Sequence, residues 1–162
     1  MITGRFPYVN RYVNRCMRGR IIWLKGMHME IRKSRNSDIE SIMDIYLHAR
    51  EFMKEHGNPN QWGPTSWPPE YLIEEDIQKG NSYVCVNEED EILGTFFFLY
   101  GEDIEPTYRN IEEGEWIGND TYGVVHRIAS SGKEKGTGTF CIEWAYKQCG
   151  HLRIDTDRKS VV

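Results

Sequence analysis

A chain of 162 residues, 39% of them hydrophobic and 12% aromatic, has enough apolar material for one folded domain, so an intrinsically disordered chain is excluded. Its net charge of −5 is unevenly spread, because residues 1–28 hold six basic and no acidic side chains and the remainder therefore carries −11. The acidic character of residues 29–162 argues against nucleic acid as a partner. The lack of any apolar run of about 18 residues argues against a membrane span.

Residues 1–28 differ from the rest of the chain, since they are basic and show no clear period. We interpret them as an N-terminal extension that is not part of the fold, and the alternative is an arm that binds an anionic partner. One domain is therefore predicted at 29–162.

The four cysteines are Cys16, Cys85, Cys141 and Cys149. They form no CxxC pair and no cluster with histidine at zinc-ligand spacing. Cys141 and Cys149 would lie about two helical turns apart, which is too far for a disulfide. The cysteines therefore predict reduced thiols in a cytoplasmic protein, with no metal site.

The first predicted elements are a strand and a long helix. Residues 30–33 alternate polar and apolar side chains, which is typical of a strand. Ser37 and Glu40 have the spacing of a capping box, so a helix is predicted with Ser37 as its N-cap. Apolar side chains then recur every three or four residues over 39–53, and the helix is expected to end near Gly57.

A proline-rich loop follows at 57–69, and a second helix is predicted from Pro68 to about Lys79, because proline suits the first turn of a helix. Three strands, a long connection, another helix and a last strand complete the pattern. They are strands at 82–86, 92–100 and 122–129, an acidic connection at 101–120, a helix that ends at Gly150 and a strand at 152–156. The order β-α-α-β-β-β-α-β indicates an α/β domain with a mixed central sheet flanked by helices.

A glycine loop joins the strand at 122–129 to the helix after it, with the sequence Lys-Glu-Lys-Gly-Thr-Gly at 133–138. Such a loop presents backbone N–H groups and the positive end of a helix dipole, which suits a phosphate group. Two phosphate-binding motifs do not fit. No glycine is followed by Lys-Ser or Lys-Thr at P-loop spacing, and Cys141 stands where a dinucleotide fingerprint needs its third glycine.

The third motif of this kind is the pyrophosphate loop of GNAT acetyltransferases, (Gln/Arg)-x-x-Gly-x-(Gly/Ala), which residues 133–138 resemble with lysine at the first position. The order of the upstream elements is also similar to that family, and the resemblance covers about 29–160. It implies a GNAT-like fold that binds acetyl-CoA and needs no metal. The residues implied for acetyl-CoA binding are Ile128, Ala129 and Ser130 on the strand and Lys133, Glu134, Lys135, Gly136, Thr137 and Gly138 in the loop.

The resemblance also implies direct transfer of the acetyl group to a primary amine of a small molecule or a peptide. Backbone N–H groups at 128–130 would polarise the thioester carbonyl, while a general base removes the proton of the incoming ammonium. The catalytic candidates are Glu51 and Glu115, and the substrate-binding candidates are Gln61 and Trp62. Each has a plainer alternative, because glutamates suit a solvated surface and Trp62 suits a loop anchor.

His126 and Arg127 are neighbours on the predicted strand at 122–129. Successive side chains of a strand alternate, so the two are expected on opposite faces of the sheet. We interpret His126 as a satisfied core histidine rather than a base, and Arg127 as a structural partner for a carboxylate.

Members of the resembled family continue beyond the strand at 152–156 with another helix and two strands, and they often carry a tyrosine there as general acid. This chain has no counterpart of that tyrosine, and Ser160 falls where the family often has asparagine near acetyl-CoA. The alternative function is therefore a degenerate acyl-CoA-binding fragment without catalysis, whose sheet edge needs a partner chain. A homodimer is left open as a partner, while nucleic acid and membrane are not expected.

Overall fold

The computed structural model describes residues 28–106 and 121–154, so most of the predicted extension at 1–28, the candidate Glu115, Ser160 and the rest of the C-terminal segment lie outside the described residues. The elements run, in chain order, β1 (Glu30–Lys33), the 3₁₀ turn η1 (Asn36–Asp38), α2 (Ile39–Glu55), α3 (Glu70–Gln78), β2 (Ser82–Val86), β3 (Ile92–Gly101), β4 (Tyr122–Ser130), α4 (Thr137–Cys149) and β5 (Leu152–Arg153). The predicted order of strands and helices is confirmed, with η1 as an addition.

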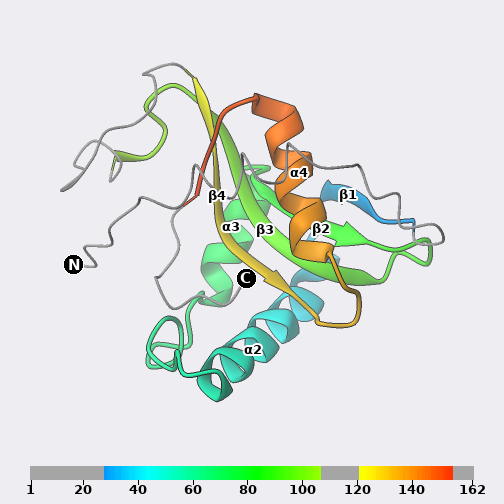
Figure 1. The fold of residues 1–162 in the computed structure, drawn as a ribbon, viewed down its shortest axis with the longest axis vertical. Coiled ribbons are helices and arrows are strands. Elements are labelled where there is room, and N and C mark those ends of the chain that lie inside the picture. The colour runs from blue at the N-terminus through cyan, green and yellow to red at the C-terminus, as the bar shows by residue number, and fades with distance from the viewer. Residues whose placement is uncertain (1–27, 107–120, 155–162) are drawn as a thin grey trace.

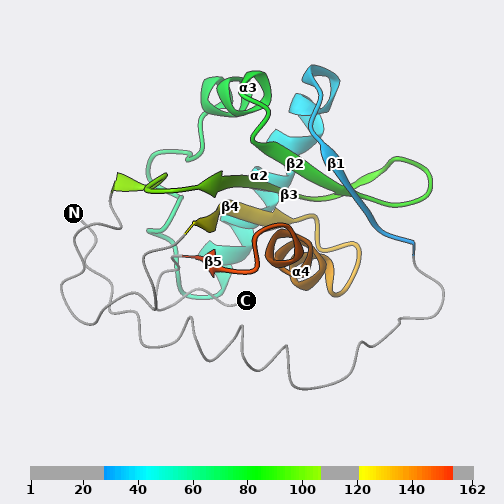
Figure 2. The same ribbon diagram turned by 90° about the horizontal axis from the view of Figure 1, so that it is seen from above.

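The strands form one five-stranded sheet in the order β1-β2-β3-β4-β5. The first four strands pair antiparallel with their neighbours, and β5 pairs parallel to β4, so the predicted mixed sheet is also confirmed. Figure 2 shows α3 and α4 on opposite sides of the strands. None of the helices in the described ranges is long and apolar enough to cross a lipid bilayer.

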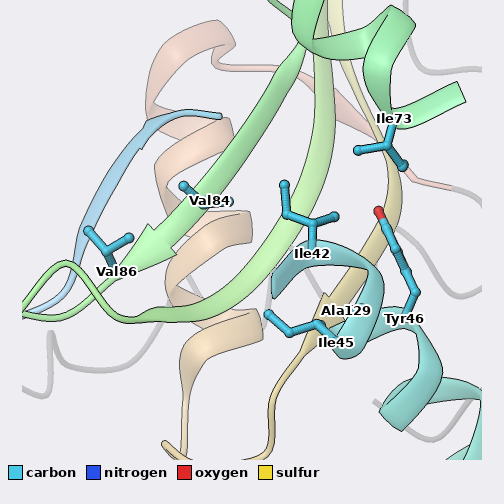
Figure 3. Close-up of a cluster of buried hydrophobic side chains, with 7 residues drawn as sticks. All are labelled: Ile42, Ile45, Tyr46, Ile73, Val84, Val86 and Ala129. Atoms are coloured by element: carbon cyan, nitrogen blue, oxygen red, sulfur yellow. The ribbon is translucent and has the colours of Figure 1, made fainter. Parts of the chain in front are cut away.

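Two larger apolar clusters, one on each face of the sheet, make up most of the core, and a smaller one contains Tyr122 and Val124. The first joins α2 and α3 to the sheet through Ile42, Ile45, Tyr46, Ile73, Val84, Val86 and Ala129 (Figure 3). The second joins α4 to the other face through Cys85, Phe96, Phe98, Val125, Cys141, Ala145 and Leu152. Alternate residues of β2 belong to different clusters, as the pleat of a strand requires. Cys85, Cys141 and Cys149 are all free thiols, as predicted for the cysteines in the described part of the chain.

The start of α2 differs from the predicted capping box. Ser37 lies inside η1 and not at the N-cap, and α2 begins at Ile39. Asp38 organises this corner instead, because its carboxylate accepts hydrogen bonds from the Arg35 backbone N–H at 2.7 Å and from the Arg32 guanidinium at 2.7 and 3.2 Å. Burial opposes ionisation of Asp38, but the bonds from Arg32 and Arg35 outweigh it and hold the pKa of this carboxyl below its usual value.

Replacing Asp38 by asparagine is expected to lower the free energy of unfolding by about 2 kcal/mol at neutral pH, because a buried charge-assisted pair with Arg32 is lost. The pKa of Asp38 is lower in the folded than in the unfolded chain, so its contribution is complete above the unfolded pKa, about 3.9, and is lost as the pH falls through the folded value. Urea unfolding of wild type and Asp38→Asn should therefore converge in acid. Glu40→Gln, at an exposed position two residues on, is the control and should leave stability unchanged.

Candidate functional site

The central feature of the site is an edge of β4 that opens beyond β5. The two strands pair only at Gly123 with Leu152 and at Val124 with Arg153. From residue 125 to residue 130, no strand in the described ranges pairs with this edge, while the opposite edge pairs with β3 as far as Ser130, with a break at residues 127 and 128. An extended ligand with amide groups could add to the open edge as a strand does.

The open edge leads directly into the glycine loop and the start of α4 (Figure 1). Ser131 donates its N–H to the Leu93 carbonyl at 2.8 Å, and the chain then leaves the sheet. The helical hydrogen bonds of α4 begin with the Phe140 N–H and the Gly136 carbonyl at 2.9 Å. The earlier N–H groups of the first turn therefore point out of the helix end, where the helix dipole is positive.

Gly136 and Gly138 have different reasons to be glycine. Gly136 is the N-cap of α4 with φ +87°, a left-handed conformation that side chains with a Cβ rarely adopt. Gly138 is helical, and a Cβ added there would meet no atom within 4 Å. Nothing in the described fold requires glycine at this second position, although glycine weakens a helix. The bare backbone leaves space for a ligand to approach the end of α4.

Thr137 fixes the corner between the loop and the sheet. Thr137 is 1% exposed, and its hydroxyl donates a hydrogen bond to the Glu134 carbonyl at 2.9 Å. Its methyl group packs closely over Gly94 of β3, because a Cβ added to Gly94 would lie only 2.8 Å from that methyl group. Because the side chain is buried and bonded, Thr137 can offer a ligand only its backbone N–H group.

Two charged side chains of the loop, those of Lys133 and Glu134, have partners within the protein. Lys133 forms an ion pair with Glu91 at 2.5 Å, and this pairing holds the pKa of Glu91 below its usual value. Glu134 accepts a hydrogen bond from the Lys135 N–H at 3.2 Å. Both groups of the Lys133–Glu91 pair are exposed, so the pair is worth little and can exchange for another anion.

A bulge interrupts β4 in the middle of the open edge. The register with β3 shifts between Thr95 and Phe97, and Arg127 has φ +52°. The prediction that His126 and Arg127 lie on opposite faces is wrong, because the bulge breaks the alternation of side chains. Both lie beside Phe97, with the His126 ring 5.8 Å and the Arg127 guanidinium carbon 4.8 Å from its ring centroid.

Polar partners from three other segments hold these two residues. Arg127 forms an ion pair with Asp76 of α3, which confirms the interpretation of Arg127 as the partner of a carboxylate. Its carbonyl accepts a hydrogen bond from the Tyr46 hydroxyl of α2 at 2.9 Å. The His126 Nε2 lies 3.0 Å from a carboxylate oxygen of Glu105. His126 and Glu105 are about one-fifth exposed, so this pair is accessible from solvent.

The predicted acceptor-side residues are not gathered at one point. Trp62 packs edge-on against Tyr46, with 5.7 Å between ring centroids, and so joins the loop at 57–69 to the cluster beside the bulge. Gln61 accepts a hydrogen bond from Asn58 at 2.6 Å. Glu51 is exposed near the end of α2, where it lines an open hollow with Lys54 and Glu55. In the described residues Glu51 makes no hydrogen bond or ion pair with β4.

The polar groups around the bulge were not found as a set by sequence reasoning. In the sequence, Asp76 and Tyr46 have nothing to distinguish them from other residues of amphipathic helices, and Glu105 is one of several acidic residues in a connecting segment. The one available signal was a histidine and an arginine within an otherwise apolar strand. Within the described ranges, no group of three or more His, Cys, Asp or Glu side chains could hold a metal ion.

No protein-family model matches the chain, and no curated protein matches its sequence. Among solved structures, the chain is similar to a GNAT-family acetyltransferase from Streptococcus agalactiae, with a TM-score of 0.67 and 29% identity over 82% of this chain and 78% of that one. A GNAT-family acetyltransferase from Listeria monocytogenes has the same fold, with a TM-score of 0.63 and 19% identity over 83% of this chain and 80% of that one.

Proposed function

We propose that this chain, which belongs to the GNAT superfamily of acetyltransferases, transfers an acetyl group from acetyl-CoA to a primary amine of a small molecule or a peptide. The observation that carries the proposal is the continuity of two features: the open edge of β4 runs directly into a glycine loop at the N-terminus of α4. An elongated ligand with amide groups in its middle and a pyrophosphate at one end matches that arrangement.

The residues present fit acetyl-CoA. The backbone of Ile128 to Ser130, on the open edge, would pair with the amides of the pantetheine arm. The loop at 133–138 and the exposed N–H groups of the first turn of α4 would bind the pyrophosphate. The space beside Gly138 supports this assignment, because a Cβ there would intrude on the ligand and on nothing in the described protein.

The transfer needs a group that removes a proton from the acceptor, since an alkyl amine is an ammonium ion at neutral pH. We propose His126 for this role. It lies two residues before Ile128, on the other side of the bulge, and Glu105 at 3.0 Å fixes the orientation of its ring. The neutral imidazole would accept the proton of the ammonium, and the amine nitrogen would then attack the thioester carbon. As the amide bond forms, the C–S bond breaks and the second proton of the amine nitrogen passes to the CoA sulfur, which leaves as the free thiol.

The acceptor would reach this point from the α2 and α3 side of the sheet, because the side chains of His126 and Arg127 lie there with Phe97 and Asp76. Trp62 and Gln61, in the loop after α2, remain the predicted acceptor-binding residues. The acidic character of residues 29–162 favours a cationic acceptor over an anionic one.

Calorimetry with acetyl-CoA followed by an assay of thiol release tests the proposal. The protein is expected to bind acetyl-CoA but not NAD, which also carries a pyrophosphate, and to release CoA thiol when small amines or short peptides are added. A lack of acetyl-CoA binding would contradict the assignment of the site. Binding without thiol release from any amine would instead favour the binding-only alternative.

A further inference from the structure

We propose that Tyr46 is a positioning residue for acetyl transfer: its hydroxyl holds the Arg127–Ile128 peptide so that the Ile128 N–H is kept out of the sheet and free for the acetyl carbonyl. The inference rests on the proposed function, because it assigns a task to one N–H group of the acetyl-CoA site.

Arg127 is held in a conformation that an unsupported strand would not adopt. Its φ of +52° lies in the left-handed region, which costs free energy for any residue with a side chain. Arg127 and Ile128 also have no register partner on β3, whereas the residues on both sides of them do. Contacts from outside the sheet must therefore stabilise the bulge.

Three such contacts converge on Arg127. The Tyr46 hydroxyl of α2 donates to its carbonyl at 2.9 Å, Asp76 of α3 pairs with its guanidinium, and the ring of Phe97 lies against that guanidinium. Only the first contact acts on the backbone itself. The other two fix the side chain and so define the direction in which the backbone leaves it.

The contact from Tyr46 sets the direction of the following N–H group. In a trans peptide the C=O and the N–H point in opposite directions, so a carbonyl of Arg127 aimed at α2 turns the N–H of Ile128 away from α2. A regular strand would direct both groups into the ladders with its neighbours. Here the carbonyl is bonded to a side chain of α2 instead, so the N–H points away from α2 and, in our proposal, is available to a ligand on the open edge.

Tyr46 is suited to hold the peptide rigidly. Its side chain is 1% exposed and packs among Ile42, Ile45 and Ile73, with the ring of Trp62 against it. Figure 3 shows its hydroxyl oxygen at the end of the ring remote from α2. Burial raises the pKa of Tyr46, so the hydroxyl keeps its proton and acts as the donor.

The test is Tyr46→Phe, which removes the hydroxyl and keeps the ring. The expected result is a fall in kcat of about 10- to 100-fold with the KM for acetyl-CoA changed less than about twofold, since an oxyanion donor contributes mainly in the transition state. The ¹³C signal of the carbonyl of bound [1-¹³C]acetyl-CoA should also move back toward its position in water, because the carbonyl is less polarised.

Tyr83→Phe is the matched control, because Tyr83 is a partly buried tyrosine that stacks with Phe96 on the other face of the sheet. It should leave kcat and the carbonyl signal unchanged. A merely structural role of Tyr46 predicts lower stability with an unchanged kcat and carbonyl signal, and that result would overturn the inference.

The inference can also be tested without acetyl-CoA. In the ligand-free protein, the ¹³C chemical shifts of Arg127 report its backbone conformation, and they should change in Tyr46→Phe but not in Tyr83→Phe. Unchanged shifts would refute the inference whether or not the protein is an enzyme. Failure of the wild-type chain to bind acetyl-CoA would instead refute the proposed function. If Tyr46→Phe does not fold, Asp76→Asn removes another contact to Arg127 and is tested by the same shifts.

A double-variant cycle gives a further check. Glycine adopts a left-handed φ without a steric cost, so a chain with Arg127→Gly should depend less on the Tyr46 hydroxyl. Adding Tyr46→Phe to Arg127→Gly is expected to lower kcat by less than Tyr46→Phe does alone. Equal effects in the two backgrounds would mean that Tyr46 does not act through the conformation of residue 127.

Discussion

Replacing Gly138 by alanine is expected to weaken acetyl-CoA binding at least tenfold while making the fold slightly more stable. Alanine favours a helix over glycine by about 0.5 kcal/mol, and a Cβ at this position meets no atom within 4 Å. A bound pyrophosphate, in contrast, would have to move away from the new methyl group. Gly138→Trp should abolish binding altogether. Calorimetry and urea unfolding of the same samples measure the two effects.

The opposite signs of these effects make Gly138 a better test than Gly136. Substitution of Gly136 forces a side chain into a left-handed conformation with φ +87°, so lost binding could follow from a disturbed loop. Thr139→Val, at an exposed position in the same turn, is the control and should keep its affinity. If Gly138→Ala were stabilised and bound acetyl-CoA as tightly as the wild type, the loop would not be the pyrophosphate site.

Replacing His126 by glutamine is expected to lower kcat by at least 100-fold with acetyl-CoA binding unchanged, because the proton of the ammonium then has no acceptor. Glu105→Gln should cause a smaller loss, of about tenfold, since Glu105 only orients the ring at 3.0 Å. Single-turnover assays separate the chemical step from binding. Both variants need the wild-type affinity for acetyl-CoA as evidence that the site is intact.

The dependence of kcat on pH tests whether His126 accepts a proton in the reaction. A base must be neutral to act, so kcat should fall toward acidic pH, where the imidazole is protonated. The charged groups near His126 include Glu105 from the segment after β3, which lies 3.0 Å from its ring, and Arg127 next to it in β4, which is itself paired with Asp76 of α3. In His126→Gln this acid limb should disappear.

Glu51→Gln distinguishes His126 from Glu51, one of the two catalytic candidates that the sequence suggested. Glu51 is exposed near the end of α2, and no described contact joins it to β4. Its substitution is expected to leave kcat within about twofold of the wild type, as for most exposed positions. A full rate in His126→Gln together with a large loss in Glu51→Gln would reverse this assignment. Glu115 stays a prediction, since it lies outside the described residues.

The sequence by itself determined the order of the elements, the class of the sheet and the place of the glycine loop. These features are encoded locally, because only a few neighbouring residues are needed to recognise the apolar period of α2, the strands β2 and β3, and the two glycines at 136 and 138. Local reasoning failed where a distant partner changed the outcome. The Ser37–Glu40 spacing suited a capping box, but the pairing of Asp38 with Arg32 of β1 placed the start of α2 at Ile39.

Only the tertiary structure decided how the site is arranged. The bulge at Arg127 depends on the register between β3 and β4, and its partners Asp76 and Tyr46 lie 51 and 81 residues away in the chain. His126 meets Glu105 across 21 residues. The periodicity of the sequence does not reveal such pairs, because the packing of α2 and α3 against the sheet brings them together. The alternation of side chains along a strand also fails at a residue with a positive φ. The glycine loop could therefore be found from residue types, whereas the groups that act beside it required the fold.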